Sequence, residues 1–170
     1  MAGINVIERF TGLDDVASEA EAIALGQSGD EGLRALKQLL RAELPDLRFW
    51  AIRGLWANGS VEAVALLIET LHDEVEMVRS GAALALGELK AGTAVAALAE
   101  LLTSDSSASG DHAADALGKI GHPAAPALIE AMQHPEARVR RLALAQRPQQ
   151  NHHVSGHGEI LPTAGTALAE

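Results

Sequence analysis

The chain contains no cysteine and no tyrosine, and aromatic residues make up only 2% of its 170 residues. Without cysteine, the sequence excludes disulfides, thiolate metal sites and a cysteine nucleophile. No apolar run approaches the ~18 residues that read as a membrane-spanning helix, and residues 1–10 lack the basic start and apolar run of a secretory signal. We therefore expect a cytoplasmic protein with no membrane partner and a core of alanine and leucine.

Basic residues are also scarce, with 13 Lys and Arg against 23 Asp and Glu and a formal net charge of −10. A nucleic-acid binder needs clustered lysine and arginine to displace counterions from phosphates. The one dense basic group is Arg138, Arg140, Arg141 and Arg147, close together near one end of the chain. The composition therefore predicts that neither DNA nor RNA is a partner.

What the chain does contain is a repeat with a period of 31 residues. Segment 78–89 matches 109–120 on one side and 47–58 on the other, and a further copy opens at Val139, one residue short of the register. Repeats of 20 to 50 residues are typical of solenoids, because one unit cannot bury its apolar face alone. Such a protein presents a surface for partners.

Each repeat resolves into two helices. In the third unit Val78, Ala82, Ala85 and Leu89 are spaced 4, 3 and 4 apart, which places them on one stripe of a helix. The apolar residues of the second helices also correspond from unit to unit. The corresponding positions are Leu36, Leu67, Leu98 and Leu128, and one turn later Leu40, Leu71, Leu102 and Met132.

Turn and cap signals predict the helix ends. Gly87 and Gly92 are expected to bracket the turn of the third unit, with Thr93 as the N-cap of its second helix. In the fourth unit Ser109-Gly110 replaces the expected Val-Arg, so this helix is predicted to start at Asp111, in a locally weak part of the stack.

The pattern of Val-Arg, small residues, Ala-Leu-Gly, a turn and Ala-Leu-Ile-Glu-Ala-Met resembles the HEAT-like repeat named after phycobilisome (PBS) lyases, over about residues 30–146. Residues 13–44 look like a diverged first unit, with helices at 13–25 and 33–44. The resemblance implies an all-α, armadillo-like α-solenoid of about four and a half helical hairpins. We expect this solenoid over residues 1–146 and a polar, disordered tail over 147–170.

Members of this family include bilin lyase subunits, phycobilisome-degradation factors and deoxyhypusine hydroxylase. The di-iron site of the hydroxylase is built from His-Glu pairs, and this chain has no His-Glu dipeptide. That activity is therefore not expected here.

Two sets of charged residues recur with the repeat. Arg48, Arg79 and Arg140 follow the residue that opens each first helix, and the resemblance implies that such arginines form structural pairs with acids of the adjoining unit. The second set is Glu69, Glu100 and Glu130, with Gln38 as its uncharged counterpart. At ~100° per residue these carboxylates point away from the core, roughly 10 Å apart along the stack. They form either an ordinary solvated face or an acidic stripe that selects a basic partner.

Trp50 and Trp56 stand where the next unit has Gly81 and Gly87. Large rings usually serve burial, so the two tryptophans are interpreted first as packing, with Trp56 near the turn and over the diverged first unit. The alternative is an anchor for a partner, because tryptophan is enriched at interface hot spots.

Residues beyond Ala145 do not continue the repeat. The stretch His152, His153, His157 and Glu159 has no helical period to fix a metal site, so no metal is expected. A last helix carrying Val139, Leu142 and Ala143 without a cap would leave apolar surface exposed. This surface would serve self-association or a docking partner. The third alternative is that the reading frame is truncated and the tail is not native.

The sequence therefore predicts a non-enzymatic scaffold or adaptor that binds a protein partner, without catalytic residues or a cofactor. The alternative is a bilin lyase subunit or chromophore chaperone acting on phycobiliproteins. A bilin carries propionates, for which the second helices offer mainly Glu apart from Arg34 and Lys37. Those two residues, the glutamate set and the tryptophans are the candidate partner-binding residues.

Overall fold

A computed structural model describes residues 5–105 and 107–146, which form helices and turns without a β-strand. Three short 3₁₀ helices, η1 (Glu8–Phe10), η2 (Gly92–Ala94) and η3 (His122–Ala124), lie among the α-helices. The α-helices are α1 (Asp15–Gly26), α2 (Gly29–Leu39), α3 (Pro45–Asn58), α4 (Val61–Thr70), α5 (Glu76–Glu88), α6 (Val95–Ser104), α7 (Ala108–Ile120), α8 (Ala125–Ala131) and α9 (Ala137–Ala145).

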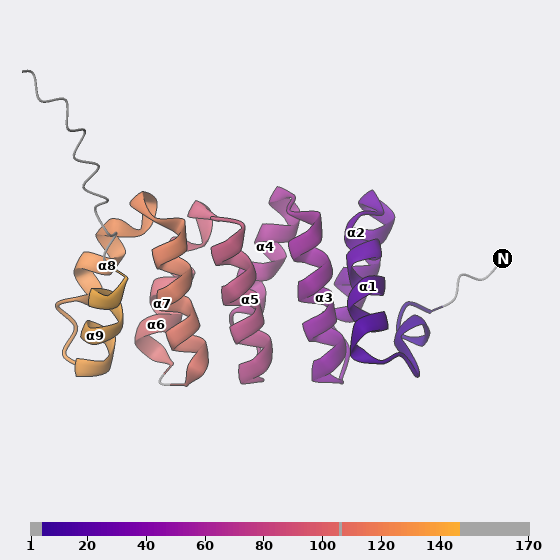
Figure 1. The fold of residues 1–170 in the computed structure, drawn as a ribbon, viewed down its shortest axis with the longest axis horizontal. Helices are drawn as coiled ribbons and strands as arrows, with labels where there is room; N and C mark the ends of the chain where they lie inside the picture. Colours follow the sequence, from indigo (N-terminus) through magenta and orange to yellow (C-terminus); the bar gives the residue numbers. More distant parts are fainter. Residues whose placement is uncertain (1–4, 106, 147–170) are drawn as a thin grey trace, which may run out of the picture.

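The helices stack in two rows, as Figure 1 shows. The first helices of the units, α1, α3, α5, α7 and α9, pack side by side in one row, and α2, α4, α6 and α8 form the second row behind it. Helices α1 and α2 contact each other, as do α3 and α4, and each second helix contacts the first helix of the next unit. The predicted all-α solenoid of about four and a half hairpins is confirmed.

The core lies between the two rows and consists of leucine and alanine. Leu36, Leu67 and Leu98 are fully buried and Leu128 is 4% exposed, so the corresponding positions of successive second helices do face inward. Burying one such side chain contributes about 1.5–3 kcal/mol. The regular leucine positions therefore hold the units in register.

Small residues let the first helices approach closely. A Cβ atom on Gly87 would lie 2.8 Å from the Cα of Ala116, which puts the backbones of α5 and α7 in near contact. Gly87 and Gly92 lie on either side of the turn at residues 89–91, as predicted, but Gly87 itself is helical, because α5 continues through it to Glu88. The glycine of the Ala-Leu-Gly motif is a helix-packing residue. The turn itself contains Lys90, which has a positive φ of 49°.

Several predicted helix ends also differ from the structure. Helix α1 begins at Asp15, where the Asp14 carboxylate accepts a hydrogen bond of 2.8 Å from the backbone N–H of Ala17. Helix α2 ends at Leu39 rather than Leu44, since Pro45 opens α3 and restricts the preceding residue to extended backbone. Thr93 lies inside η2 and is not an N-cap.

The first helix of the fourth unit begins earlier than predicted. Helix α7 starts at Ala108, with Ser107 at its N-cap position, and Asp111 is already inside the helix. Ser109 is fully buried in this first turn, at the position where the repeat has Val78. The first turn of α7 can bury a serine at this position because the hydroxyl has hydrogen-bond partners, which are described below.

Candidate interaction surface

The exposed side chains of α2, α4, α6 and α8, with the residues that follow each helix, form what we call the second-helix face. Glu69, Glu100 and Glu130 are all exposed on it, one from each of three successive helices. Within the described part of the chain, none of the three carboxylates forms an ion pair. Their charges are therefore free to meet a partner.

Grooves run between neighbouring helices of this face. A groove of about 420 Å³ lies between α2 and α4, and Glu69 lines it together with Lys37, Arg41 and His72. A second groove, of about 240 Å³, lies between α6 and α8, and both Glu100 and Glu130 line it. The structure thus places each predicted glutamate at the wall of a groove on one face.

The basic candidates lie at the amino-terminal end of the same face. Arg34 is exposed and lines a groove of about 770 Å³ between the amino-terminal segment, α1 and α2. Lys37 bridges to Glu62 on α4. Arg41, which the sequence reasoning did not single out, is exposed at the wall of the groove between α2 and α4. Its position seven residues after Arg34, two helical turns on, is the signal that would have identified it.

The two tryptophans lie apart from this face, on α3. Trp50 is half-buried against the core, with its ring in an edge-to-face contact with Phe49 at 5.5 Å. Trp56 is half-buried inside α3 rather than at a turn, with the guanidinium of Arg53 over its ring at 4.6 Å. It lines an apolar groove of about 230 Å³ between α3 and α5. Trp50 does not line that groove, so the two rings are not one site.

The recurring arginines lie at the joints between units. Arg48 is buried, and its Nε and Nη2 donate hydrogen bonds of 2.8 and 3.0 Å to the two carboxylate oxygens of Asp73. Its Nη1 donates to the backbone carbonyls of Ala42 and Glu43 at 3.0 and 3.1 Å. The hydrogen bond to Asp73 raises the pKa of Arg48 above its usual value despite the burial. One side chain thus ties α3 to the turns before it and after α4.

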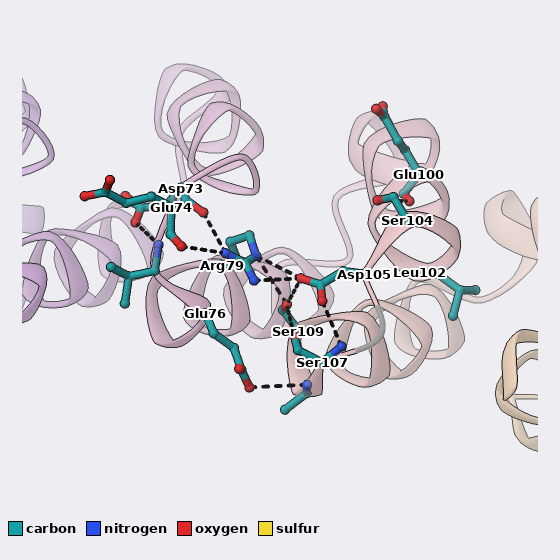
Figure 2. A network of polar contacts seen from close by, with 12 residues as sticks. Asp73, Glu74, Glu76, Arg79, Glu100, Leu102, Ser104, Asp105, Ser107 and Ser109 are labelled. Atoms are coloured by element: carbon teal, nitrogen blue, oxygen red, sulfur yellow. Dashed lines mark hydrogen bonds and ion pairs between the residues drawn. The ribbon is translucent and has the colours of Figure 1, made fainter.

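Arg79 repeats this arrangement one unit on, as Figure 2 shows. It forms an ion pair of 2.8 Å with Asp105 and donates to the backbone carbonyls of Asp73 and Glu74 at 2.8 and 3.0 Å. Arg140 donates to the carbonyls of His134 and Pro135 at 2.8 and 2.6 Å, but has no carboxylate partner among residues 5–105 and 107–146.

The fourth unit lacks this arginine, and another residue takes part of its role. A Cβ atom on Gly110 would lie 2.1 Å from the carbonyl oxygen of Asp105, so the turn passes close over the helix. Arg138 from the next unit reaches back and donates to the carbonyls of Leu102 and Asp105 at 3.1 and 2.7 Å. It also pairs with Asp111 at 3.2 Å. The repeat pattern gave no signal for Arg138.

Asp105 is the acceptor at the centre of the network in Figure 2. Burial would raise the pKa of its carboxyl group, but hydrogen bonds from Ser107 and Ser109 and from Arg79 outweigh burial and hold this pKa well below its usual range. The buried Ser109 hydroxyl donates to this carboxylate. The joint predicted to be weak is therefore bridged by charge-assisted hydrogen bonds.

The lowered pKa predicts an acid dependence of stability. Because the folded chain holds this carboxylate ionised more strongly than the unfolded chain, its contribution is present above about pH 4 and is lost as pH falls toward the folded pKa. We expect Asp105→Asn to be less stable than wild type at neutral pH, with the difference shrinking below about pH 4. Urea unfolding at a series of pH values measures this. A difference that stays constant down to acid pH would contradict it.

The last helix, α9, buries more of its apolar side chains than predicted. Val139 and Ala143 are fully buried, and Leu142 is partly buried against the core. Leu144 is 50% exposed. The apolar surface at this end is thus smaller than the sequence predicted, and self-association through it stays a prediction.

Within residues 5–105 and 107–146, no three histidine, aspartate or glutamate side chains gather closely enough to hold a metal ion. None of the helices in those ranges combines the length and apolar character of a membrane span. The histidines at 152, 153 and 157, and the predicted disorder of the tail, lie outside the described residues.

Comparisons with known proteins agree with this architecture. The family model for HEAT repeats matches residues 33–109 and 77–147. The chain is similar to a solved complex of CpcE and CpcF of phycocyanin lyase from Nostoc sp. PCC7120, with 26% identity over 88% of this chain and 68% of that chain and a TM-score of 0.59. Two engineered proteins are similar at 20% and 19% identity, over 81% and 83% of this chain and 74% and 46% of theirs, with TM-scores of 0.48 and 0.47.

No curated protein sequence matches the chain. The repeat model nevertheless covers more than half of its length, and the likeness to the phycocyanin lyase complex extends over most of it. The chain belongs to the HEAT-repeat proteins, with repeats like those of the phycobilisome lyases.

Proposed function

We propose that this chain is a non-enzymatic HEAT-repeat scaffold that binds a protein partner through its second-helix face. The observation that carries the proposal is the pair of grooves on this face, whose walls carry Glu69 on α4 and Glu100 and Glu130 on α6 and α8. Solenoids use such extended faces to bind partners along several repeats. Exposed carboxylates without ion pairs favour a partner segment rich in lysine and arginine.

The spacing of the carboxylates supports binding rather than catalysis. Glu69 lines a different groove from Glu100 and Glu130, so the three carboxylates do not gather in one pocket. A general acid and a general base must both reach one substrate. Carboxylates spread along a stack are suited instead to several contacts with one extended partner.

The test is affinity capture from native cell extract with the full chain as bait, compared between two charge-matched variants. In the first, Glu69, Glu100 and Glu130 become Gln; in the second, Glu8, Asp15 and Asp46 become Gln, Asn and Asn. The control residues are exposed and lie outside the second-helix face. We expect the first variant to capture at least tenfold less of the partner than wild type does, because each of several lost charge contacts weakens binding.

The outcome separates the two candidate roles of the glutamates. Equal loss from both variants would mean that net charge alone drives capture. Unchanged capture by the first variant would overturn the second-helix face as the binding surface.

The likeness to the CpcE and CpcF complex favours a second candidate function, that of a bilin lyase subunit. In that role the chain would pair with another HEAT chain and hold an open-chain tetrapyrrole. On the second-helix face, among residues 5–105 and 107–146, the propionates of a bilin would meet lysine or arginine only near α2, where Arg34 and Arg41 are exposed. Mixing the purified chain with a bilin separates the functions: a new visible absorbance band supports the lyase role, and its absence supports the scaffold.

A further inference from the structure

Helix α9 leaves exposed a position that the earlier first helices bury. The corresponding residues of α3, α5 and α7 are Ile52, Ala83 and Ala114, which are 1%, 0% and 0% exposed. In α9 the position holds Leu144, which is 50% exposed. Each of the three earlier helices is covered by the first helix of the next unit. Within residues 5–105 and 107–146 no such helix follows α9, so this end of the stack has an open repeat contact.

Arg140, one helical turn before Leu144, is incompletely paired. In the second unit, Nη1 of Arg48 donates to two backbone carbonyls, and its Nε and Nη2 donate to the carboxylate of Asp73. Nη1 of Arg140 makes the same two kinds of backbone contact. Among the described residues, Nε and Nη2 of Arg140 have no partner. The group that this joint lacks is therefore a carboxylate placed as Asp73 is.

The second unit also shows what kind of segment fills both contacts. Asp73 comes three residues before the start of α5 at Glu76, and α5 packs on α3. Gly81 of α5 lies opposite Ile52, because a Cβ atom added there would be 3.4 Å from Cδ1 of Ile52. Leucine and isoleucine have the same size, so a small residue also suits Leu144. The complementary segment is an acidic residue followed by a helix that carries a small residue in its first two turns.

A second copy of this chain fits the open contact poorly. Helix α9 contains no acidic residue, so two copies that met through α9 would bring no carboxylate from that helix to Arg140. Asp111 and Glu136 are already paired with Arg138. At the other end of the stack, η1 packs on α1 and its Phe10 is buried. These observations favour a different protein as the occupant.

We propose that the open end of α9 binds a helical segment of another protein that carries an acidic residue just before the helix, as Asp73 and α5 pack on α3. The carboxylate accepts hydrogen bonds from Nε and Nη2 of Arg140, and the helix covers Leu144. This surface lies in the first row of helices and is separate from the second-helix face. It goes beyond the proposed scaffold function and does not depend on it.

A peptide of this chain's own residues 73–89 tests the proposal, because it contains Asp73 and all of α5. The peptide, labelled at its carboxyl end, is expected to bind the full chain saturably in fluorescence anisotropy. The same peptide with Asp73→Asn is expected to bind about tenfold more weakly, because it loses the charge-assisted pair with Arg140. A peptide of the same composition in shuffled order is the control for nonspecific binding.

Variants of the full chain locate the site. Arg140→Ala is expected to weaken binding of the wild-type peptide about tenfold and to weaken the Asp73→Asn peptide no further, because that pair is already lost. Leu144→Asp should also weaken binding, since it places a charge where the helix packs. Arg141→Ala is the matched control, because Arg141 is the exposed neighbouring arginine on the same helix. It should bind the peptide as wild type does.

A loss of binding in Arg140→Ala and Leu144→Asp, but not in Arg141→Ala, supports the inference. No saturable binding, as when residues 147–170 fill this end, overturns it, and so does equal loss from Arg140→Ala and Arg141→Ala. A dimer of the chain alone that Leu144→Asp dissociates in sedimentation velocity also overturns it, because the occupant is then a second copy. None of these outcomes changes the test of the second-helix face, which uses the glutamate variants.

Discussion

Replacing Arg48 by alanine is expected to lower the free energy of unfolding by about 3–5 kcal/mol, because the change leaves a nearly buried carboxylate without its partner. The Asp73 side chain is only 13% exposed, and Arg48 is 7% exposed. The variant also loses the two hydrogen bonds to the carbonyls of Ala42 and Glu43. Urea unfolding followed by far-ultraviolet circular dichroism measures the loss.

Arg140→Ala is the matched control. Arg140 occupies the same place in its unit as Arg48 and donates to two backbone carbonyls. Within residues 5–105 and 107–146 it has no carboxylate partner. We expect it to cost about 1 kcal/mol. If the two variants cost the same, the Asp73 pair does not stabilise the joint. Combining Arg48→Ala with Asp73→Ala should recover part of the loss, because no buried charge then remains unpaired.

The second large effect is expected for Gly87→Ala, at about 1–2 kcal/mol of lost stability. The new Cβ would lie 2.8 Å from the Cα of Ala116, so α5 and α7 must move apart. Overpacking of this kind costs about 1–3 kcal/mol, and the better helix propensity of alanine returns about 1 kcal/mol. A clash with backbone relaxes poorly, which places the net change on the destabilising side.

Gly92→Ala provides the comparison for Gly87. The nearest atom to a Cβ at Gly92 is the Cβ of Pro123 at 3.8 Å, an ordinary contact. Its stability should change by less than about 0.5 kcal/mol in the same urea experiment. A stabilised Gly87→Ala variant would show that the helices do not need the close approach.

The solenoid could be predicted because its signal is local and repeated. Leucines at corresponding places, such as Leu67 and Leu98, report the buried stripe of each second helix, and the structure buries both completely. The same helical periodicity that buries these leucines also places Glu69 and Glu100 outside, where the structure exposes them. Local periodicity therefore sufficed for the fold and for the orientation of the candidate surface.

The remaining features depend on contacts between units, which a single repeat does not encode. The sequence placed Gly87 beside a turn but could not show that Ala116 of the next unit approaches it, and this approach is what excludes a side chain there. Arg138 could not be foreseen because it belongs to one unit and binds the carbonyls of another.

The most direct test of the account is whether capture of a protein partner depends on the second-helix face. The account predicts that the variant with Glu69, Glu100 and Glu130 changed to Gln loses the partner, while the variant changed at Glu8, Asp15 and Asp46 keeps it. Undiminished capture by the first variant, with folding confirmed by its circular dichroism, would contradict the account.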